Sequence, residues 1–461
     1  MPFEARKSVV GLLGKRKKPE KKGKREKVMT QDKPNLRLEF EQVRPALCRA
    51  AVVIDKDLVT RLYNQAVLSQ QKTVSAQGFQ QGSVPLQYIK QNFNVSLIEH
   101  LKEFLFHYFV IGFLNKEIRA QKIFAAGEPR LTDIDVAPGK EAHFHFDLTT
   151  FSPIEFQHWK YFPFKPPKRK RYKDLDRQVT SFVKEEKELQ KKCIDCTIGI
   201  GDWVCFDIDL VDRQNRPVFG AHKENLWLKI GNEAGDEEYQ QLFLNRKAEE
   251  TFLTNETCIQ DYFSSQIDTH YTFSINIKDV LHDKQFCFDH FKKHFKIKTN
   301  KEMMQRLVEV FSYRNDLSQR QMMIEESLRL LLARHPFTVP KYMVLRQERQ
   351  VIDAVKNNPD YHVYRMQKDF RDYVRQLAEK QIKETILLDQ LAQKENISVG
   401  HDDIKLYLNL TKRPRMKDFI YFEHPETKID GREMPISAEL LKQSCLREKT
   451  LNHIIYHLTK K

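Results

Sequence analysis

The hydrophobic period changes along this chain, and that change limits the folds it can adopt. Residues 36–53 and 142–151 alternate apolar with polar side chains, as half-buried strands do. The strongly apolar stretch 95–118 between them is typical of a buried helix. Period two returns between residues 201 and 281, which predicts a small β-rich module.

The last third of the chain has a helical period. Apolar side chains form stripes over residues 370–395 and 437–458, and the pattern is helical from about Phe288 onward. The segment 413–435 interrupts the last two helices, and the sequence assigns it no role. Together these patterns predict an α+β multidomain protein, with an α+β head, a small β-rich module and an all-helical C-terminal part.

Length and composition agree with several domains. A chain of 461 residues suggests about three domains at roughly 150 residues each. Only 15 glycines and 31% charged residues favour a helix-rich protein. No apolar run approaches the roughly 20 residues that span a bilayer, so no membrane partner is expected. Seven cysteines, an odd number, and no export signal indicate a reducing cytoplasm.

Positive charge is concentrated near the N-terminus. The chain carries a net charge of +15, and residues 1–28 hold eleven Lys or Arg against three Glu. A second basic cluster occupies residues 166–173. These charges either keep the chain soluble or bind the phosphates of a nucleic acid.

Other motifs give weaker signals. The pair Cys193 and Cys196 has no second pair at metal spacing, and His143 and His145 share a strand face as two potential ligands only. No phosphate-binding glycine loop, catalytic carboxylate pair or nucleophile motif stands out. We therefore expect no metal and no cofactor.

The stretch GFQQGSVP at residues 78–85 interrupts a helical pattern. Gly78 and Gly82 permit tight backbone geometry, and Pro85 suits the start of the next helix. This arrangement predicts a helix-to-helix tip that holds Phe79 outward.

The same stretch, with the helix pattern LQYIKQNF after it, resembles the signature loop of trigger factor. Trigger factor is the bacterial ribosome-associated chaperone with an FKBP-type prolyl isomerase domain. Four further segments, in the family's order, are similar to its strand exit from the head, its entry into the second helical arm, its arm helix and its terminal helix: GEPRLTDIDVAPGKEAHFHFDL, FTVPKYMVLRQ, RQLAEKQIKETILLDQLAQKENISVGHDDI and REKTLNHIIYHL. The resemblance covers about residues 35–461.

The resemblance implies a domain order and a function. The expected domains are a basic disordered extension (1–34), a ribosome-binding head (35–152), a linker (153–196), an FKBP-type isomerase-like module (197–285) and a helical chaperone domain (286–461). The implied partners are the ribosome, on the large subunit near the tunnel exit, and nascent or unfolded polypeptides, whose folding is assisted without ATP. A homodimer away from the ribosome is a further possibility. Two alternatives stay open: a basic RNA-binding or ribosome-assembly factor on the same scaffold, and a ribosome-independent cytosolic holdase.

The tip departs from the family pattern. The family's Arg, Lys and Lys correspond here to Gln80, Gln81 and Ser83, and lost phosphate contacts weaken binding. We hypothesise that the N-terminal arm supplies rRNA attraction instead, while the tip still sets the docking point. The predicted ribosome-binding residues are Gly78, Phe79, Gln80, Gln81, Gly82, Lys15, Arg16, Lys17 and Lys18.

The isomerase assignment stays open at this point. Rotation about an X-Pro bond needs only a dry pocket that favours the twisted amide. Where the family has an apolar run, this chain has GDEEYQQLF at residues 235–243, and its carboxylates would wet such a pocket. A residual catalytic site is assigned to Phe206, Asp207, Trp227 and Tyr239, although Phe206 and Trp227 are equally suited to a core.

The helical arms are expected to form a cradle for clients. Unbranched methionines suit promiscuous binding, although Met at helical spacing is more often core. The candidate client-binding residues are Met322, Met323, Tyr342, Met343 and Tyr407.

Overall fold

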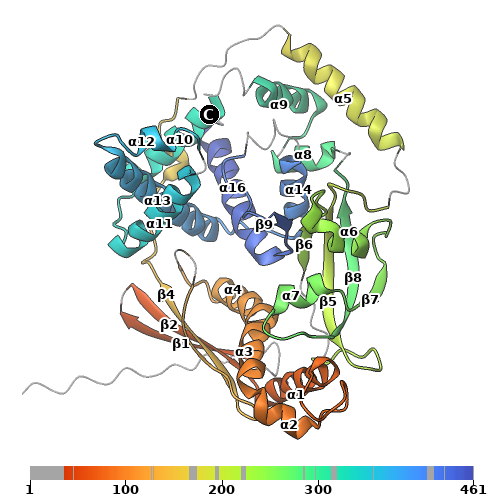
Figure 1. The fold of residues 1–461 in the computed structure, drawn as a ribbon. Coiled ribbons are helices and arrows are strands. Elements are labelled where there is room, and N and C mark those ends of the chain that lie inside the picture. Colours follow the sequence, from red (N-terminus) through yellow and green to blue (C-terminus); the bar gives the residue numbers. More distant parts are fainter. Residues whose placement is uncertain are drawn as a thin grey trace, which may run out of the picture.

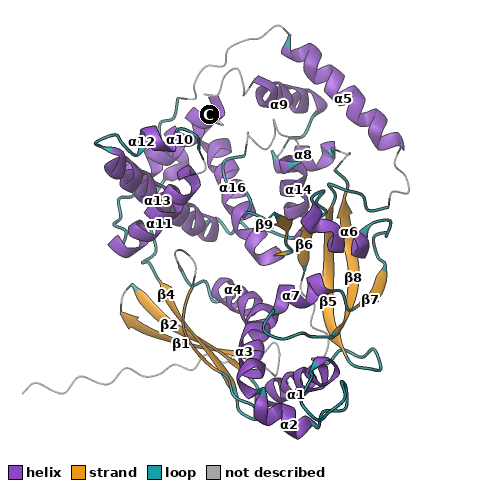
Figure 2. Ribbon diagram, viewed as in Figure 1, coloured by secondary structure: helices purple, strands orange, loops and turns teal. Residues whose placement is uncertain are grey.

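The structure is a computed structural model, and it describes residues 36–459. The short segments 45, 126, 128, 166–173, 193–196, 220–224, 284–285, 296, 313–318, 357, 413–419 and 430 are outside the described residues. The predicted basic extension, the cluster at 166–173 and the Cys-x-x-Cys pair therefore also lie outside them. Figures 1 and 2 show a head, a central sheet and a group of helices.

The head is a four-stranded antiparallel sheet covered by helices on one face. Its strand order is β1-β2-β4-β3, so the first hairpin pairs with the last one through β2 and β4. Burial alternates along β4, where each second side chain from Ala142 to Leu148 is buried against the helices. The elements are β1 (Leu36–Arg44), β2 (Leu47–Ile54), α1 (Lys56–Thr73), α2 (Leu86–Asn92), α3 (Asn94–Leu105), the π-helix η1 (Phe106–Val110), α4 (Ile111–Ala120), β3 (Arg130–Asp135) and β4 (Ala142–Thr149).

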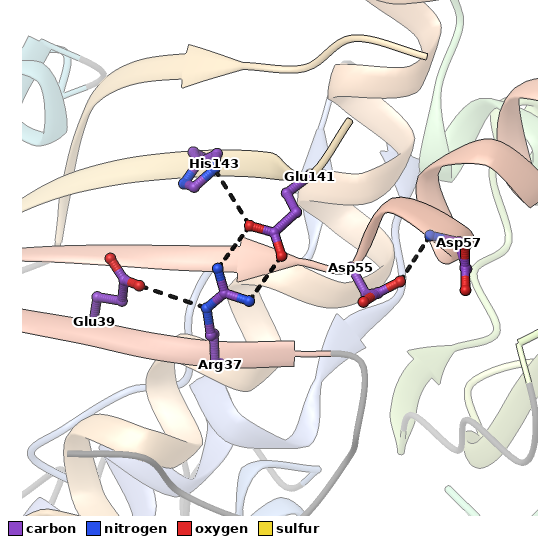
Figure 3. A network of polar contacts seen from close by, with 6 residues as sticks. All are labelled: Arg37, Glu39, Asp55, Asp57, Glu141 and His143. Carbon is purple, nitrogen blue, oxygen red and sulfur yellow. Dashed lines mark hydrogen bonds and ion pairs between the residues drawn. The ribbon is translucent and has the colours of Figure 1, made fainter. Parts of the chain in front are cut away.

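A polar network joins the strands of the head where the chain enters α1 (Figure 3). Arg37 on β1 makes two hydrogen bonds to the carboxylate of Glu141, at 2.9 and 2.7 Å. His143 lies 3.9 Å from the same carboxylate. Asp55 caps α1 by accepting a hydrogen bond from the backbone N–H of Asp57 at 2.7 Å. The paired Arg and Glu therefore span β2 and stabilise the sheet at the end next to the helices.

The segment that follows β4 packs as an aromatic belt on the C-terminal helices. Phe156 and Trp159 are buried, and the Trp159 indole donates a hydrogen bond to Glu395 at 3.0 Å. The backbone N–H of Ile154 donates to the Gln390 side chain at 2.6 Å. This belt includes the short 3-10 helix η2 (Trp159–Tyr161), and α5 (Leu175–Lys192) follows and packs on α9.

The central module is built on a five-stranded sheet of order β11-β6-β5-β8-β7. The module's own strands are antiparallel neighbours, in the part of the chain where the period-two pattern predicts a β-rich module. Its elements are β5 (Trp203–Val211), β6 (Leu226–Lys229), the 3-10 helix η3 (Ala234–Asp236), α6 (Glu237–Phe243), β7 (Thr251–Thr254), α7 (Thr257–Phe263) and β8 (Thr272–Leu281).

The C-terminal domain is mainly helical. In Figure 1, α11, α12 and α13 lie together on the side of the molecule above the head sheet, and α14 and α16 lie next to the central sheet. The helices are α8 (Phe288–His294), α9 (Asn300–Ser312), α10 (Gln319–Arg334), α11 (Lys341–Lys356), α12 (Tyr361–Tyr364), α13 (Phe370–Lys394), α14 (His401–Thr411) and α16 (Ala438–Thr459).

The sequence-based expectation that everything beyond Phe288 is helical was wrong in one place. The segment between α14 and α16 contains a two-stranded hairpin, β9 (Lys428–Ile429) with β10 (Arg432–Glu433), and the strand β11 (Ile436–Ser437). β11 pairs with β6, so the C-terminal part contributes an edge strand to the central sheet. Strands of two residues are too short to produce a readable period in the sequence.

Candidate functional site

The predicted tip lies between α1 and α2 and is formed by two tight turns. The N–H of Phe79 donates to the Ala76 carbonyl at 3.1 Å, and the N–H of Ser83 donates to the Gln80 carbonyl at 3.0 Å. Gly78 and Gly82 are the third residues of these turns and have φ of +89° and +84°, a region that favours glycine. The structure thus gives both glycines the tight geometry that the sequence predicts.

Phe79 is held partly outward at the tip. Its side chain is 40% exposed and its ring lies 5.5 Å from that of Tyr88 on α2. Val84, near the end of the tip, is fully buried, and its carbonyl accepts a hydrogen bond from the Gln71 side chain at 2.8 Å. The backbone of the tip is therefore held to the head by a hydrogen bond and by buried Val84, while the Phe79 side chain is partly exposed to solvent.

The charge of the tip comes from its flanking helices and not from its turns. Gln80, Gln81 and Ser83 are exposed and neutral. Lys72 in the last turn of α1 and Lys90 in the last turn of α2 are also exposed. Lys72 directly precedes the tip, whereas the Lys90 ammonium lies against Asn64 and Tyr63 of α1. The sequence-based site did not include either lysine because both fall outside the glycine motif.

The four predicted catalytic residues lie on two opposite faces of the central sheet. Neighbouring residues of a strand point to opposite sides, so Phe206 and Asp207 on β5 cannot line one pocket. Phe206 packs against Phe243 of α6, with ring centroids 5.0 Å apart. Asp207 is 2% exposed and forms an ion pair with Lys278 at 2.7 Å.

Trp227 and Tyr239 are separated in the same way. Trp227 is fully buried on the side of the C-terminal helices and stacks on His401 at 5.4 Å. Tyr239 belongs to the core on the other side, donates a hydrogen bond to the Cys258 carbonyl at 3.2 Å, and has its pKa raised by burial. The structure therefore does not bring the four residues together, and each is part of a core.

The carboxylates of the GDEEYQQLF segment have partners inside the protein. Asp236 is 1% exposed and accepts hydrogen bonds from the backbone N–H groups of Glu233, at 3.1 Å, and Glu433, at 2.8 Å. Glu238 lies 3.6 Å from the Arg432 guanidinium. These acids thus contact the β9–β10 hairpin, a role that the sequence did not suggest.

The predicted client-binding residues divide between surface and core. Tyr342 and Met322 are 55% and 43% exposed. Met323 and Met343 are both 9% exposed, and Tyr407 is fully buried, with its hydroxyl donating to the Phe422 carbonyl at 2.5 Å. The expectation that these last three residues offer a surface was wrong, because a helical stripe in the sequence does not show which face meets a neighbouring helix.

Exposed apolar side chains gather instead on α11, α12 and the start of α13. Met366 is 80% exposed, and Tyr373 and Val363 are 65% and 64% exposed. We call this set the arm surface; it comprises Tyr342, Leu345, Val363, Tyr364, Met366, Tyr373 and Leu377. Val363, Tyr364 and Met366 were missed in the sequence because the short connection around α12 has no hydrophobic period. Leu345, Tyr373 and Leu377 lie on α11 and α13, where the sequence does not show which side chains a neighbouring helix covers.

A groove lies beside the arm surface, between α10 and α13. It has a volume of about 900 Å³, and its apolar lining includes Met322, Leu332 and Ala333. Acidic and basic side chains of both helices line the rest of it, among them Glu384, whose pKa is raised mainly by burial. The groove combines apolar contacts with charges of both signs.

Two absences hold for the parts of the chain that the structure describes. No cluster of three or more His, Cys, Asp or Glu side chains there is arranged to hold a metal ion, and His143 and His145 stack on one another with ring centroids 6.1 Å apart. No helix within these same residues is sufficiently long and apolar to cross a membrane.

Comparisons with known proteins point to a single family. The sequence model described as "Bacterial trigger factor protein (TF)" matches residues 37–182, and the one described as "Bacterial trigger factor protein (TF) C-terminus" matches residues 299–413. The trigger factor of Geobacter metallireducens is 21% identical over 369 residues, which cover 76% of this chain and 82% of that protein. The trigger factor of Rickettsia canadensis is 22% identical over 411 residues, covering 87% of this chain and 88% of that protein.

A solved structure also aligns along most of the chain. It comes from work on promiscuous substrate recognition in the folding and assembly activities of the trigger factor chaperone. The alignment covers 91% of this chain and 100% of that one at 12% identity, with a TM-score of 0.35. At that score the similarity does not define how the domains are arranged.

Proposed function

From the premise that this chain belongs to the trigger factor family, as a divergent member, we propose how its surfaces divide the work of a chaperone. The protein is a trigger-factor-like chaperone, and the family implies that it binds the ribosome and nascent polypeptides. The observation that carries our proposal is the pair of exposed apolar sites, one at the tip of the head and one on the arm surface. We place its work in the cytoplasm.

In our proposal the tip docks on the large ribosomal subunit near the tunnel exit. Phe79 acts as an apolar wedge, since it is exposed at a tip whose backbone is fixed by two turns. Lys72, in the last turn of α1, provides positive charge directly before the tip. The neutral turns weaken the attraction to phosphate, and the basic residues 1–28 supply it by contacting rRNA.

Salt dependence tests the role of the basic extension. Deleting residues 1–28 removes eleven cationic side chains, so we expect weaker pelleting with ribosomes and a shallower dependence of affinity on salt. Unchanged pelleting at low salt would contradict this role. Tight binding to bare rRNA fragments, with a steep salt slope, would favour an RNA-binding factor instead.

The arm surface and the adjoining groove bind unfolded segments in our proposal. Exposed Met366 and Met322 offer flexible, polarisable contacts, and Tyr373 offers an aromatic one. Such contacts adapt to many sequences because they need no fixed hydrogen-bond pattern. When no client is bound, the same exposed apolar area favours a homodimer, because large apolar patches tend to be covered.

Suppression of aggregation tests the client surface. The double variant Met366→Ser and Tyr373→Ser removes two of its most exposed apolar side chains and leaves the core intact. We expect it to require several-fold more chaperone to keep a chemically unfolded protein soluble after dilution. Lys368→Ser, an exposed polar change in the same segment, is the matched control. Equal protection by the double variant and the control would refute the assignment.

A further inference from the structure

The central sheet is covered on both faces by other parts of the same chain. The face of the sheet that α6 and α7 cover shares a hydrophobic core with the head. The opposite face of the sheet shares a hydrophobic core with α8, α9, α14 and α16. On the second face, Asp279 of β8 lies 2.5 Å from Lys405 and 3.1 Å from His401, both on α14. Figure 1 shows the module beside both the head and these helices.

An aromatic wedge from the head enters the first face. The Tyr108 ring lies 5.7 Å from Phe219 and 5.1 Å from Phe263, both of the module. Phe104 lies 5.2 Å from Phe263, and Phe109 lies 5.1 Å from Phe219. Tyr108 and Phe109 belong to the π-helical turn η1. Such turns are rare in proteins, and those that occur often lie at functional positions. The wedge therefore covers the aromatic side of the module that Phe219 and Phe263 form, and a proline peptide that bound there would have to displace it.

Hydrogen bonds fix this wedge in position. The Tyr108 hydroxyl accepts a hydrogen bond from the backbone N–H of Leu210 at 3.1 Å. The His100 imidazole and the Tyr271 hydroxyl are 2.8 Å apart, and both residues are buried. Glu103 accepts a hydrogen bond from the Ser264 hydroxyl at 2.6 Å. Specific polar contacts at a buried apolar surface indicate one preferred docking geometry.

A strap from the C-terminal domain contacts the N-terminal end of α6. We define the strap as residues 427–429 and 431–437, which include β9, β10 and β11. Arg432 places its guanidinium 5.1 Å from the centre of the Tyr239 ring and 3.6 Å from Glu238. Lys428 pairs with Glu233, and Asp236 accepts the N–H of Glu433. The carboxylates of the GDEEYQQLF segment are thus the anchor points of the strap.

We propose that the isomerase-like module of this chain is a structural joint, which the head wedge and the strap hold closed against proline peptides. The wedge joins the head to the module, and the strap with its β11 strand joins the module to the helical domain. Together with the aromatic belt that follows β4 and the direct contact of Tyr342 with Thr149 of β4, the joint fixes the arm surface at a set distance from the docking tip. The altered GDEEYQQLF segment and the strap that contacts it then act together in this joint.

Distance measurements on ribosome-free protein test the joint. A keto amino acid at Val95 on the head and at Met366 on the arm allows two fluorophores to be attached to the full chain, because these side chains are 76% and 80% exposed. We expect one narrow energy-transfer distribution. Arg432→Glu places a negative charge beside Glu238 and should broaden the distribution at least twofold. The charge exchange Arg432→Glu with Glu238→Arg should restore a narrow distribution.

The control variant carries the same two fluorophores and is judged by the same energy-transfer distribution. Arg213→Glu makes an identical charge change at an exposed site of the module and should leave the distribution narrow. A broad distribution in the unaltered chain, or no effect of Arg432→Glu, would overturn the proposal. A proline-peptide isomerisation rate well above the uncatalysed rate in the full chain would overturn it as well, because the aromatic face would then be open. Ribosome binding is not measured in either assay, so the docking proposal is judged separately.

Discussion

Removing the hydroxyl of Tyr108 tests the contact between the head and the central module. Pairing of β5 with β6 ends at Phe206, and beyond it the Leu210 N–H points to the Tyr108 hydroxyl at 3.1 Å. Leu210 and Tyr108 are each 2% exposed. Tyr108→Phe keeps the ring and its aromatic neighbours, and therefore deletes one acceptor without opening a large cavity.

The expected cost follows from leaving a buried donor unpaired. An unsatisfied buried N–H costs about 1 to 3 kcal/mol. At about 1.4 kcal/mol for each tenfold change, this corresponds to roughly a 5- to 150-fold increase in the opening equilibrium. The increase should be confined to the module and the helix that contacts it, because stability is local in a protein of several domains.

Hydrogen exchange on the full chain is the direct assay. Peptides that cover Trp203–Val211 should exchange about 5- to 150-fold faster in Tyr108→Phe, whereas those that cover β1 and β2 should not change. Tyr161→Phe, a variant of a 78% exposed tyrosine, controls for the substitution itself. A change of less than twofold in the β5 peptides would refute the reasoning.

Three further predictions concern other parts of the molecule. Burial lowers the pKa of His100 from 6.5 to about 4. As the pH falls from 6.5 to about 4, the imidazole is therefore protonated in the unfolded chain but not in the folded one, and the free energy of unfolding of the head should decrease by at most about 3 kcal/mol. A pH dependence unchanged in His100→Gln would contradict this. Glu448→Gln removes the buried carboxylate that pairs with the buried Arg320 guanidinium at 2.7 Å, and should cost about 3 to 5 kcal/mol in thermal or denaturant unfolding; a cost below about 1 kcal/mol would count against the pair. Gly82→Ala meets no neighbouring atom but must adopt φ of +84°, which strains the folded tip by about 1 to 2 kcal/mol. Hydrogen exchange at the tip should therefore become roughly 5- to 30-fold faster, with a smaller effect for Gly82→Asn.

Hydrophobic period predicted the elements of the head and the arms well. The strand at 142–151 appears as β4, and the stripe over 370–395 appears as α13. Both elements are long and bury one face, which is the condition under which a period is readable. The glycines of the tip were predictable for a different reason, since a positive φ selects for glycine at single positions.

The candidate sites depended on packing between domains, which the sequence does not reveal. Met343 and Tyr407 lie on helices as predicted, but neighbouring helices cover them. Asp236 and Glu238 were interpreted as groups that wet a pocket, whereas contacts with the strap about 195 residues later give them partners. Residues that far apart carry no shared local pattern, so only the tertiary structure could bring them together.

Co-sedimentation with ribosomes tests the central claim most directly. The full chain, Phe79→Ala and Val95→Ala are compared at low salt, the last being an exposed apolar control elsewhere on the head. A chaperone that docks through its tip should pellet with ribosomes, Phe79→Ala should reduce the pelleted fraction several-fold, and Val95→Ala should leave it unchanged. If the full chain stays in the supernatant, or if Phe79→Ala pellets as well as the full chain, docking through the tip is contradicted.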